Sequence, residues 1–199
     1  MIYPPTPPRN APARTAQVTR AGAYLLNQVA QHAAVHACEL TGHEALVRSL
    51  LQQHLLLCRT TRIGQVLSLS SGGCQHLGLS RRDLTSPATA ATAVYRRAAL
   101  HLVADGGFAP VRPVNQYITE ITDGHRRSWL YATGKINAPS PDVIDKVVIR
   151  AGTYALNGTV IVVADDVSAY RQRTSAFTAF RHLPFSSLAD RLPPIPPLA

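Results

Sequence analysis

The chain has 199 residues, and 46% of them are hydrophobic, which is enough for one large core or two small ones. Lysine and arginine total 20 against 11 aspartate and glutamate, so the formal net charge at pH 7 is +9. That excess favours a polyanionic partner, either nucleic acid or an anionic membrane surface. No run reaches the roughly 18 apolar residues of a transmembrane helix, so we expect no membrane partner and a cytoplasmic, nucleoid-associated protein.

The three cysteines, Cys38, Cys58 and Cys74, are an odd number and are widely spaced in the sequence. Each lies in an apolar or helical context, which predicts buried free thiols rather than a disulfide framework. Free thiols are typical of a reducing cytoplasm.

Both ends of the chain are rich in proline. Residues 1–15 hold five prolines and residues 186–199 hold four, which favours polyproline-like or disordered segments over helix or central strand. We therefore predict a proline-rich arm at one end and a proline-rich tail at the other. An alternative is that these arms pack onto a neighbouring subunit, and with the long N-terminal helix predicted below they indicate a homodimer.

The N-terminal part has a helical pattern. Apolar residues recur at three- and four-residue steps over 15–40, which predicts a first helix. A second helix is predicted over 41–58, where Thr41 and Glu44 have the spacing of a capping box. A third, short helix is predicted over 60–67.

A capped helix and a hairpin follow. Ser86 before Pro87 is a strong helix start, and Gly106-Gly107 is a stop signal. The alternating strands that flank Asp123-Gly124 predict a β-hairpin with a basic tip. A helix followed by a short cationic hairpin is the order of parts in a winged helix-turn-helix, whose wing lies along DNA phosphates.

The C-terminal part changes composition again. A plausible linker over 134–141 precedes an apolar strand over 159–164 and a helix over about 167–180. The fold class we predict is α+β, with a helical N-terminal part, a winged helix-turn-helix with a β-hairpin wing, and a small strand–helix unit. The helical and winged-helix DNA-binding domain would span 16–133, and the small α/β element would span 141–185.

Basic side chains are the candidate DNA contacts. Three Arg-Arg pairs fall within 47 residues, and neutralising several phosphates makes binding strong and dependent on salt. Two threonines on the early turns of the helix add contacts to backbone or base edges. The predicted DNA-binding residues are Arg81, Arg82, Thr89, Thr92, Arg96, Arg97, His125, Arg126 and Arg127.

The stretches 60–66 and 95–97, followed by 102–108, resemble winged-helix domains of the plasmid replication-relaxation type. The resemblance extends over about 43–131. It implies that 60–66 is a helix, that an arginine-bearing helix and a wing contact DNA, and that 160–180 belongs to a small α/β region after the wing.

The function we predict is non-catalytic binding to double-stranded DNA in bacterial replication, repair or regulation, with no cofactor and no metal. One alternative is a metal-dependent nuclease that uses Asp165 and Asp166 at the end of the apolar strand, with Asp142, Asp145 and Lys146 nearby in the sequence. Another is an assembly protein whose proline arms clasp neighbours around nucleic acid.

Overall fold

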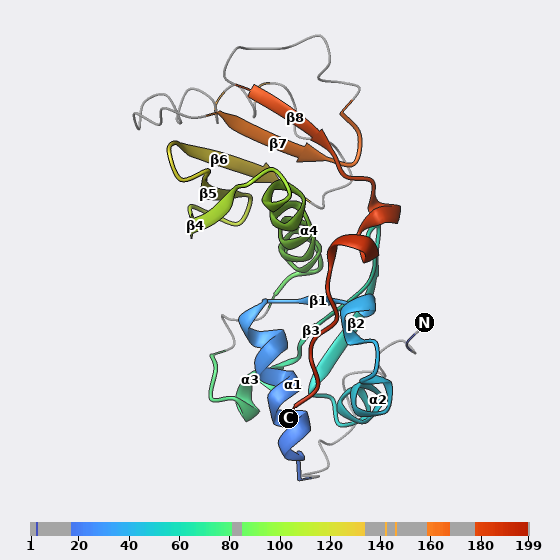
Figure 1. The fold of residues 1–199 in the computed structure, drawn as a ribbon. Helices are drawn as coiled ribbons and strands as arrows, with labels where there is room; N and C mark the ends of the chain where they lie inside the picture. The colour runs from blue at the N-terminus through green and yellow to red at the C-terminus, as the bar shows by residue number, and fades with distance from the viewer. Residues whose placement is uncertain are drawn as a thin grey trace. The chain divides into compact units, whose positions relative to one another are not determined.

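The computed structural model describes Tyr3 and residues 17–80, 85–133, 142, 146, 159–167 and 178–198. The chain divides into two compact units, one of Met1–Val94 with Leu192–Ala199 and one of Tyr95–Arg191 (Figure 1). The fold is α+β, with a three-stranded sheet in the first unit and a five-stranded mixed sheet in the second. The predicted fold class is therefore wrong in its main feature, because the larger sheet dominates where a winged helix-turn-helix was expected.

The first unit begins with helix α1 (Arg20–Gln31), whose N-terminus is capped by Thr19 Oγ1, 3.1 Å from the Gly22 nitrogen. The predicted helix over 15–40 is wrong in its second half. Ala33 takes a left-handed backbone with φ of +60°, which ends the helical path. The chain then forms the short strand β1 (Val35–His36) and a 3-10 helix, η1 (Ala37–Leu40).

Helix α2 (Glu44–Gln52) follows η1 and is shorter than the predicted helix over 41–58. The capping box lies at η1 instead of at Thr41. The His36 backbone donates to Glu39 Oε2 at 2.7 Å, and the Cys38 backbone donates to His36 Nδ1 at 3.3 Å. The apolar side of α2 packs into the core of the unit through Val47, Leu50 and Leu51.

Strands β2 (Leu56–Thr61) and β3 (Gly64–Leu69) form an antiparallel hairpin, and β1 pairs with the other edge of β3. The helix predicted over 60–67, and implied by the family resemblance, is thus wrong. Gly64 has φ of +100°, a conformation that favours glycine and reverses the chain at the turn. The β-branched residues before and after this turn also favour extended strands over a helix.

Helix α3 (Ser71–His76) follows, and α4 (Pro87–Ala104) comes after it. The predicted start of α4 is confirmed, because Ser86 Oγ accepts from the Thr89 backbone at 3.2 Å. The predicted stop is confirmed as well, since α4 ends just before Gly106 and Gly107, and Gly107 has φ of +84°. The boundary between the two units falls within α4.

The core of the first unit includes side chains from both ends of the chain. Tyr3 is 1% exposed, and its backbone makes two hydrogen bonds with the Gln65 side chain, at 2.8 and 3.0 Å. Ile195 is 6% exposed; its nitrogen donates to Glu39 O at 2.7 Å, and its carbonyl accepts from His43 Nε2 at 2.9 Å. These two residues of the predicted arm and tail therefore pack within their own chain.

The second unit is built on strands β4 (Ala109–Pro113), β5 (Ile118–Thr122), β6 (Arg127–Ala132), β7 (Val160–Ala164) and β8 (Thr178–His182), in that spatial order. The first three strands are antiparallel, and the last three are parallel to one another. In the second unit, β8 is followed by two short 3-10 helices, η4 (Phe185–Ser187) and η5 (Ala189–Arg191).

The predicted hairpin is confirmed as β5 and β6, joined by a turn at Asp123-Gly124. Asp123 Oδ1 accepts from the backbones of His125 at 2.9 Å and Arg126 at 2.7 Å. These hydrogen bonds, Arg126 first, hold the pKa of Asp123 below its usual value. The hairpin is not a wing, however, because β4 and β7 pair with its two outer edges and place it inside the sheet.

The predicted C-terminal strand is confirmed as β7, and all of its side chains are buried. The helix predicted over 167–180 is wrong where it meets β8, since Thr178–His182 is a strand parallel to β7. Residues 168–177 of that predicted helix, the whole of the predicted linker over 134–141 and Asp145 lie outside the described residues.

Candidate nucleic-acid interface

A three-residue turn, Thr41-Gly42-His43, joins η1 to α2. Gly42 has φ of +88°, and its nitrogen donates to Glu44 Oε1 at 2.9 Å. That bond to the Gly42 backbone lowers the pKa of Glu44. The turn therefore connects η1 directly to α2. Its glycine supplies a backbone conformation that other residues rarely adopt.

The outer side of α2 carries Ala45, Arg48 and Gln52, all of them exposed. Their spacing of three and four residues places them on one face of the helix, opposite the buried Val47 and Leu51. Arginine and glutamine are side chains that pair with guanine and adenine edges in the major groove. This face thus combines a cation, an amide and a small residue that permits close approach.

The β2–β3 hairpin offers a second exposed cation, Arg62, in its two-residue turn. Thr61 Oγ1 donates to the Gly64 carbonyl at 2.8 Å and fixes that turn. The neighbouring Arg59 has a structural role instead, because its Nη1 donates to the Thr85 carbonyl at 2.8 Å. Burial lowers the pKa of Arg59.

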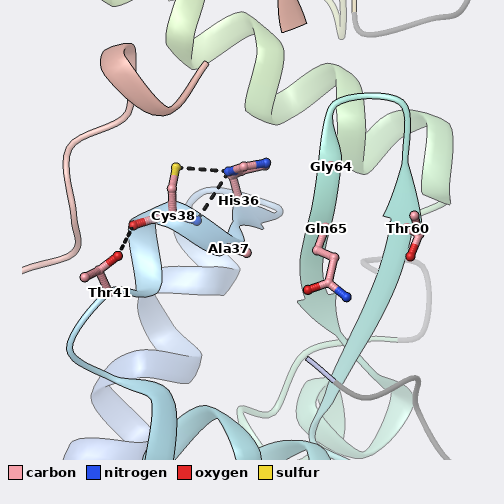
Figure 2. Close-up of a pocket in the computed structure, with 7 residues that line it drawn as sticks. All are labelled: His36, Ala37, Cys38, Thr41, Thr60, Gly64 and Gln65. Carbon is pink, nitrogen blue, oxygen red and sulfur yellow. Dashed lines mark hydrogen bonds between the residues drawn. The ribbon is translucent and has the colours of Figure 1, made fainter. Parts of the chain in front are cut away.

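A pocket of about 530 Å³ lies between η1 and the β2–β3 hairpin. Figure 2 shows His36 and Cys38 linked by hydrogen bonds on one side of the pocket and Gln65 on β3 on the other. Thr41 closes one end, where its Oγ1 donates to the Cys38 carbonyl at 2.8 Å. The pocket therefore adjoins the turn that leads into α2.

A third basic group lies in the second unit, on the antiparallel part of the sheet. Glu120 of β5 is 2% exposed, and its two oxygens accept from Arg112 Nε at 2.7 Å and Arg127 Nη1 at 3.1 Å. Both arginine side chains are about two-thirds exposed. A buried carboxylate thus holds two cations, and one of them, Arg127, follows the exposed His125 and Arg126 in the chain.

The predicted DNA-binding residues are not all on an accessible surface. Arg81 and Arg82 lie outside the described residues. Thr89 Oγ1 is 2.8 Å from Ser86 Oγ within the helix cap, and Thr92 is only 1% exposed. Thr92 therefore presents no hydroxyl to a ligand in this structure.

The arginine pairs of the second unit are held by different partners. Arg96 Nη1 donates to the Asn115 carbonyl at 2.9 Å, which ties α4 to the connection between β4 and β5. Burial, and then the nearby Arg97, lower the pKa of Arg96. Arg127 instead donates to Glu120, so Arg96 and Arg127 have separate partners.

The carboxylates of the nuclease alternative have no metal-site geometry in the described part of the chain. Asp165 Oδ1 accepts from the Phe185 backbone at 2.7 Å and so anchors the segment after β8. Asp142 and Lys146 are exposed. Among the described residues, no three His, Cys, Asp or Glu side chains are grouped so that they could hold a metal ion.

Among the residues of these groups that were missed from sequence are Arg48, Gln52, Arg112 and Glu120. The first two had a usable signal, since they occupy the polar face of an amphipathic helix. Arg112 and Glu120 had none, because the register between β4 and β5, which includes a bulge after Pro110, decides that they meet.

Comparisons with known proteins give no relative: no family model, no curated protein and no solved structure matches the chain. Within the described ranges, no helix combines the length and the hydropathy needed to cross a bilayer.

Proposed function

We propose that this protein binds double-stranded DNA without catalysing a reaction on it, and that α2 enters the major groove. The observation that carries the proposal is local to the first unit. Two helical segments are joined by a three-residue turn containing Gly42, and the second segment exposes Ala45, Arg48 and Gln52. Proteins that read the major groove with a helix contact base edges from one exposed face of that helix, which is the role proposed here for α2.

The chemistry of the exposed side chains supports this assignment. Arg48 can donate two hydrogen bonds to the O6 and N7 atoms of guanine, and Gln52 can pair with the N6 and N7 atoms of adenine. Arg62 in the hairpin turn suits a phosphate contact, which positions the protein without reading sequence. These three residues combine base readout with backbone anchoring, and binding of this kind would associate the protein with the nucleoid.

The second unit adds a phosphate-binding surface in this proposal. Arg112 and Arg127 are held side by side by Glu120 and keep most of their surface in solvent. Arginine held in place in this way loses less side-chain entropy when it binds a phosphate. The net charge of +9 supports the same partner, because a cationic chain is drawn to a polyanion over long range.

The test compares two arginines of the first unit. A duplex site is first selected from a random-sequence pool, and binding is then measured for Arg48→Ala and for Arg20→Ala. Arg20 is exposed at the first residue of α1, so its removal changes the net charge equally without touching the proposed groove-reading face. Circular dichroism verifies that both variants fold.

We expect Arg48→Ala to weaken binding to the selected site by about 1–3 kcal/mol and to relax the preference at one base pair. Arg20→Ala should cause only a small, sequence-independent loss. Equal losses for the two variants, or a pool that yields no preferred site, would refute base readout by α2.

A further inference from the structure

The pocket beside η1 contains a hydrogen-bonded Cys–His pair. Cys38 Sγ lies 3.0 Å from His36 Nδ1, and His36 Nε2 lies 2.7 Å from the Ile63 carbonyl. A carbonyl oxygen only accepts, so Nε2 carries the ring proton and the lone pair of Nδ1 faces the thiol. His36 therefore contacts a nucleophile through Nδ1, which also accepts from the Cys38 backbone N–H at 3.3 Å, and is oriented by a third group at Nε2.

The fold keeps this pair in place and open to small molecules. A Cβ atom at Gly64 would lie 2.7 Å from His36 Nε2, so only glycine leaves room for the ring beneath the hairpin. Cys38 is partly exposed and lines the pocket of about 530 Å³ (Figure 2). The pocket is the side from which a peroxide or an alkylating reagent would approach the sulfur.

The other two cysteines have different surroundings. Cys74 is fully buried in the apolar core of the first unit. Cys58 lies on β2, and burial raises the pKa of its thiol. Burial of this kind disfavours the thiolate, which is the reactive form. The chain thus contains its own two reference thiols.

We propose that Cys38, assisted by His36, is a nucleophilic thiol and the site at which hydroperoxides modify this protein. The sulfur attacks one peroxide oxygen as His36 Nδ1 takes the thiol proton, and the O–O bond breaks. With hydrogen peroxide, the thiol becomes a sulfenic acid, oxidised by two electrons, and the peroxide is reduced to one water that receives the proton. This proposal does not depend on DNA binding.

The first test exposes the full chain to hydrogen peroxide, traps sulfenic acid with dimedone and quantifies each cysteine by peptide mass spectrometry. At pH 7 an ordinary thiol is only a few per cent ionised, so we expect Cys38 to be labelled at least about tenfold faster than Cys58 or Cys74. Equal labelling of the three cysteines would overturn the proposal.

The second test uses His36→Asn, which keeps an acceptor for the Cys38 backbone N–H at the cap of η1 but removes the base. We expect labelling of Cys38 to fall to the rate of an unassisted thiol. If His36 only supported the local structure, the variant would expose Cys38 and raise its labelling. An unchanged or higher rate at Cys38 would contradict the proposed role of the imidazole.

A pH profile of alkylation by iodoacetamide separates assistance from accessibility. The ionisable neighbours on the η1 side are His36 and Glu39, whose carboxylate accepts from the His36 backbone, whereas β2 and β3 line the pocket with Thr60, Gly64 and Gln65. We expect the wild-type rate at Cys38 to persist well below pH 8.5, and the His36→Asn rate to rise with a midpoint near about 8.5. Superimposable profiles would contradict the assignment.

Discussion

At the scale of single residues, the most informative side chain is Glu120. Its carboxylate is almost completely buried in the sheet, yet both of its partners, Arg112 and Arg127, are largely in solvent. A buried carboxylate is costly unless it is paired, so the two arginines offset that cost while their outer N–H groups remain available. The same contacts therefore stabilise the sheet and position two cations.

This arrangement predicts coupling between the two arginines. Arg112→Ala or Arg127→Ala alone leaves Glu120 one partner, whereas the double variant leaves a buried charge with neither arginine, at a cost of about 3–5 kcal/mol. We expect the double variant to lose more unfolding free energy than the two single variants together, by about 0.5–3 kcal/mol. Urea unfolding measures the cycle, with the exposed Arg126→Ala as a control. Additive losses would mean that Glu120 does not couple them.

At the scale of elements, sequence identified the parts that have local signals. Ser86-Pro87 marks the start of α4, Asp123-Gly124 marks the turn between β5 and β6, and the apolar run of β7 is continuous. It failed where long-range pairing decides the conformation. β2 and β3 fall on the two helices predicted over 41–58 and 60–67, and it is their antiparallel pairing that makes them strands.

The candidate site was predictable to a similar extent. The basic character of the chain follows from its net charge, and the exposed face of α2 follows from the spacing of its polar residues. The position of the β5–β6 hairpin inside the sheet could not be predicted, because β6 pairs with a strand that begins at Val160, far along the chain. Because of that pairing, the hairpin predicted as a wing forms two inner strands of the sheet.

Two buried tyrosines of the second unit, Tyr131 and Tyr95, lead us to expect that the unfolding free energy decreases at alkaline pH. The pKa of Tyr131 is raised to about 12, first by burial and then by Tyr117. The rings of Tyr117 and Tyr131 are stacked, with their centroids 6.2 Å apart. Burial likewise raises the pKa of Tyr95, whose hydroxyl donates to the Leu183 carbonyl at 2.8 Å. In the unfolded chain a tyrosine ionises near about pH 10, so this contribution is full below pH 10 and is lost as the pH rises toward about 12.

We therefore expect the unfolding free energy to decrease between pH 9 and pH 11.5, and to decrease less in Tyr131→Phe, which has no phenol to ionise. Tyr24→Phe on α1 is the matched control, because Tyr24 is only partly buried. Chemical denaturation at several pH values gives the comparison. Identical pH dependence in Tyr131→Phe and wild type would show that this hydroxyl carries no such contribution.

At the scale of the whole molecule, two units each present exposed arginines on a chain whose net charge is +9. In the first unit they include Arg48 on α2 and Arg62 at the hairpin turn, and in the second they include Arg112 and Arg127. If both units contact the phosphate backbone, binding must release several counterions at once. The proposed binding of duplex DNA therefore depends on the charge of these arginines as well as on the fit of α2 to the major groove.

The most direct test is a salt titration of binding to duplex and to single-stranded DNA of the same sequence. With six or more phosphate contacts, the dissociation constant for the duplex should rise about a thousandfold between roughly 50 and 200 mM salt. A helix that reads the major groove should also bind the duplex more tightly than the single strand. A dissociation constant that does not change with salt, or equal affinity for the two forms, would contradict the account.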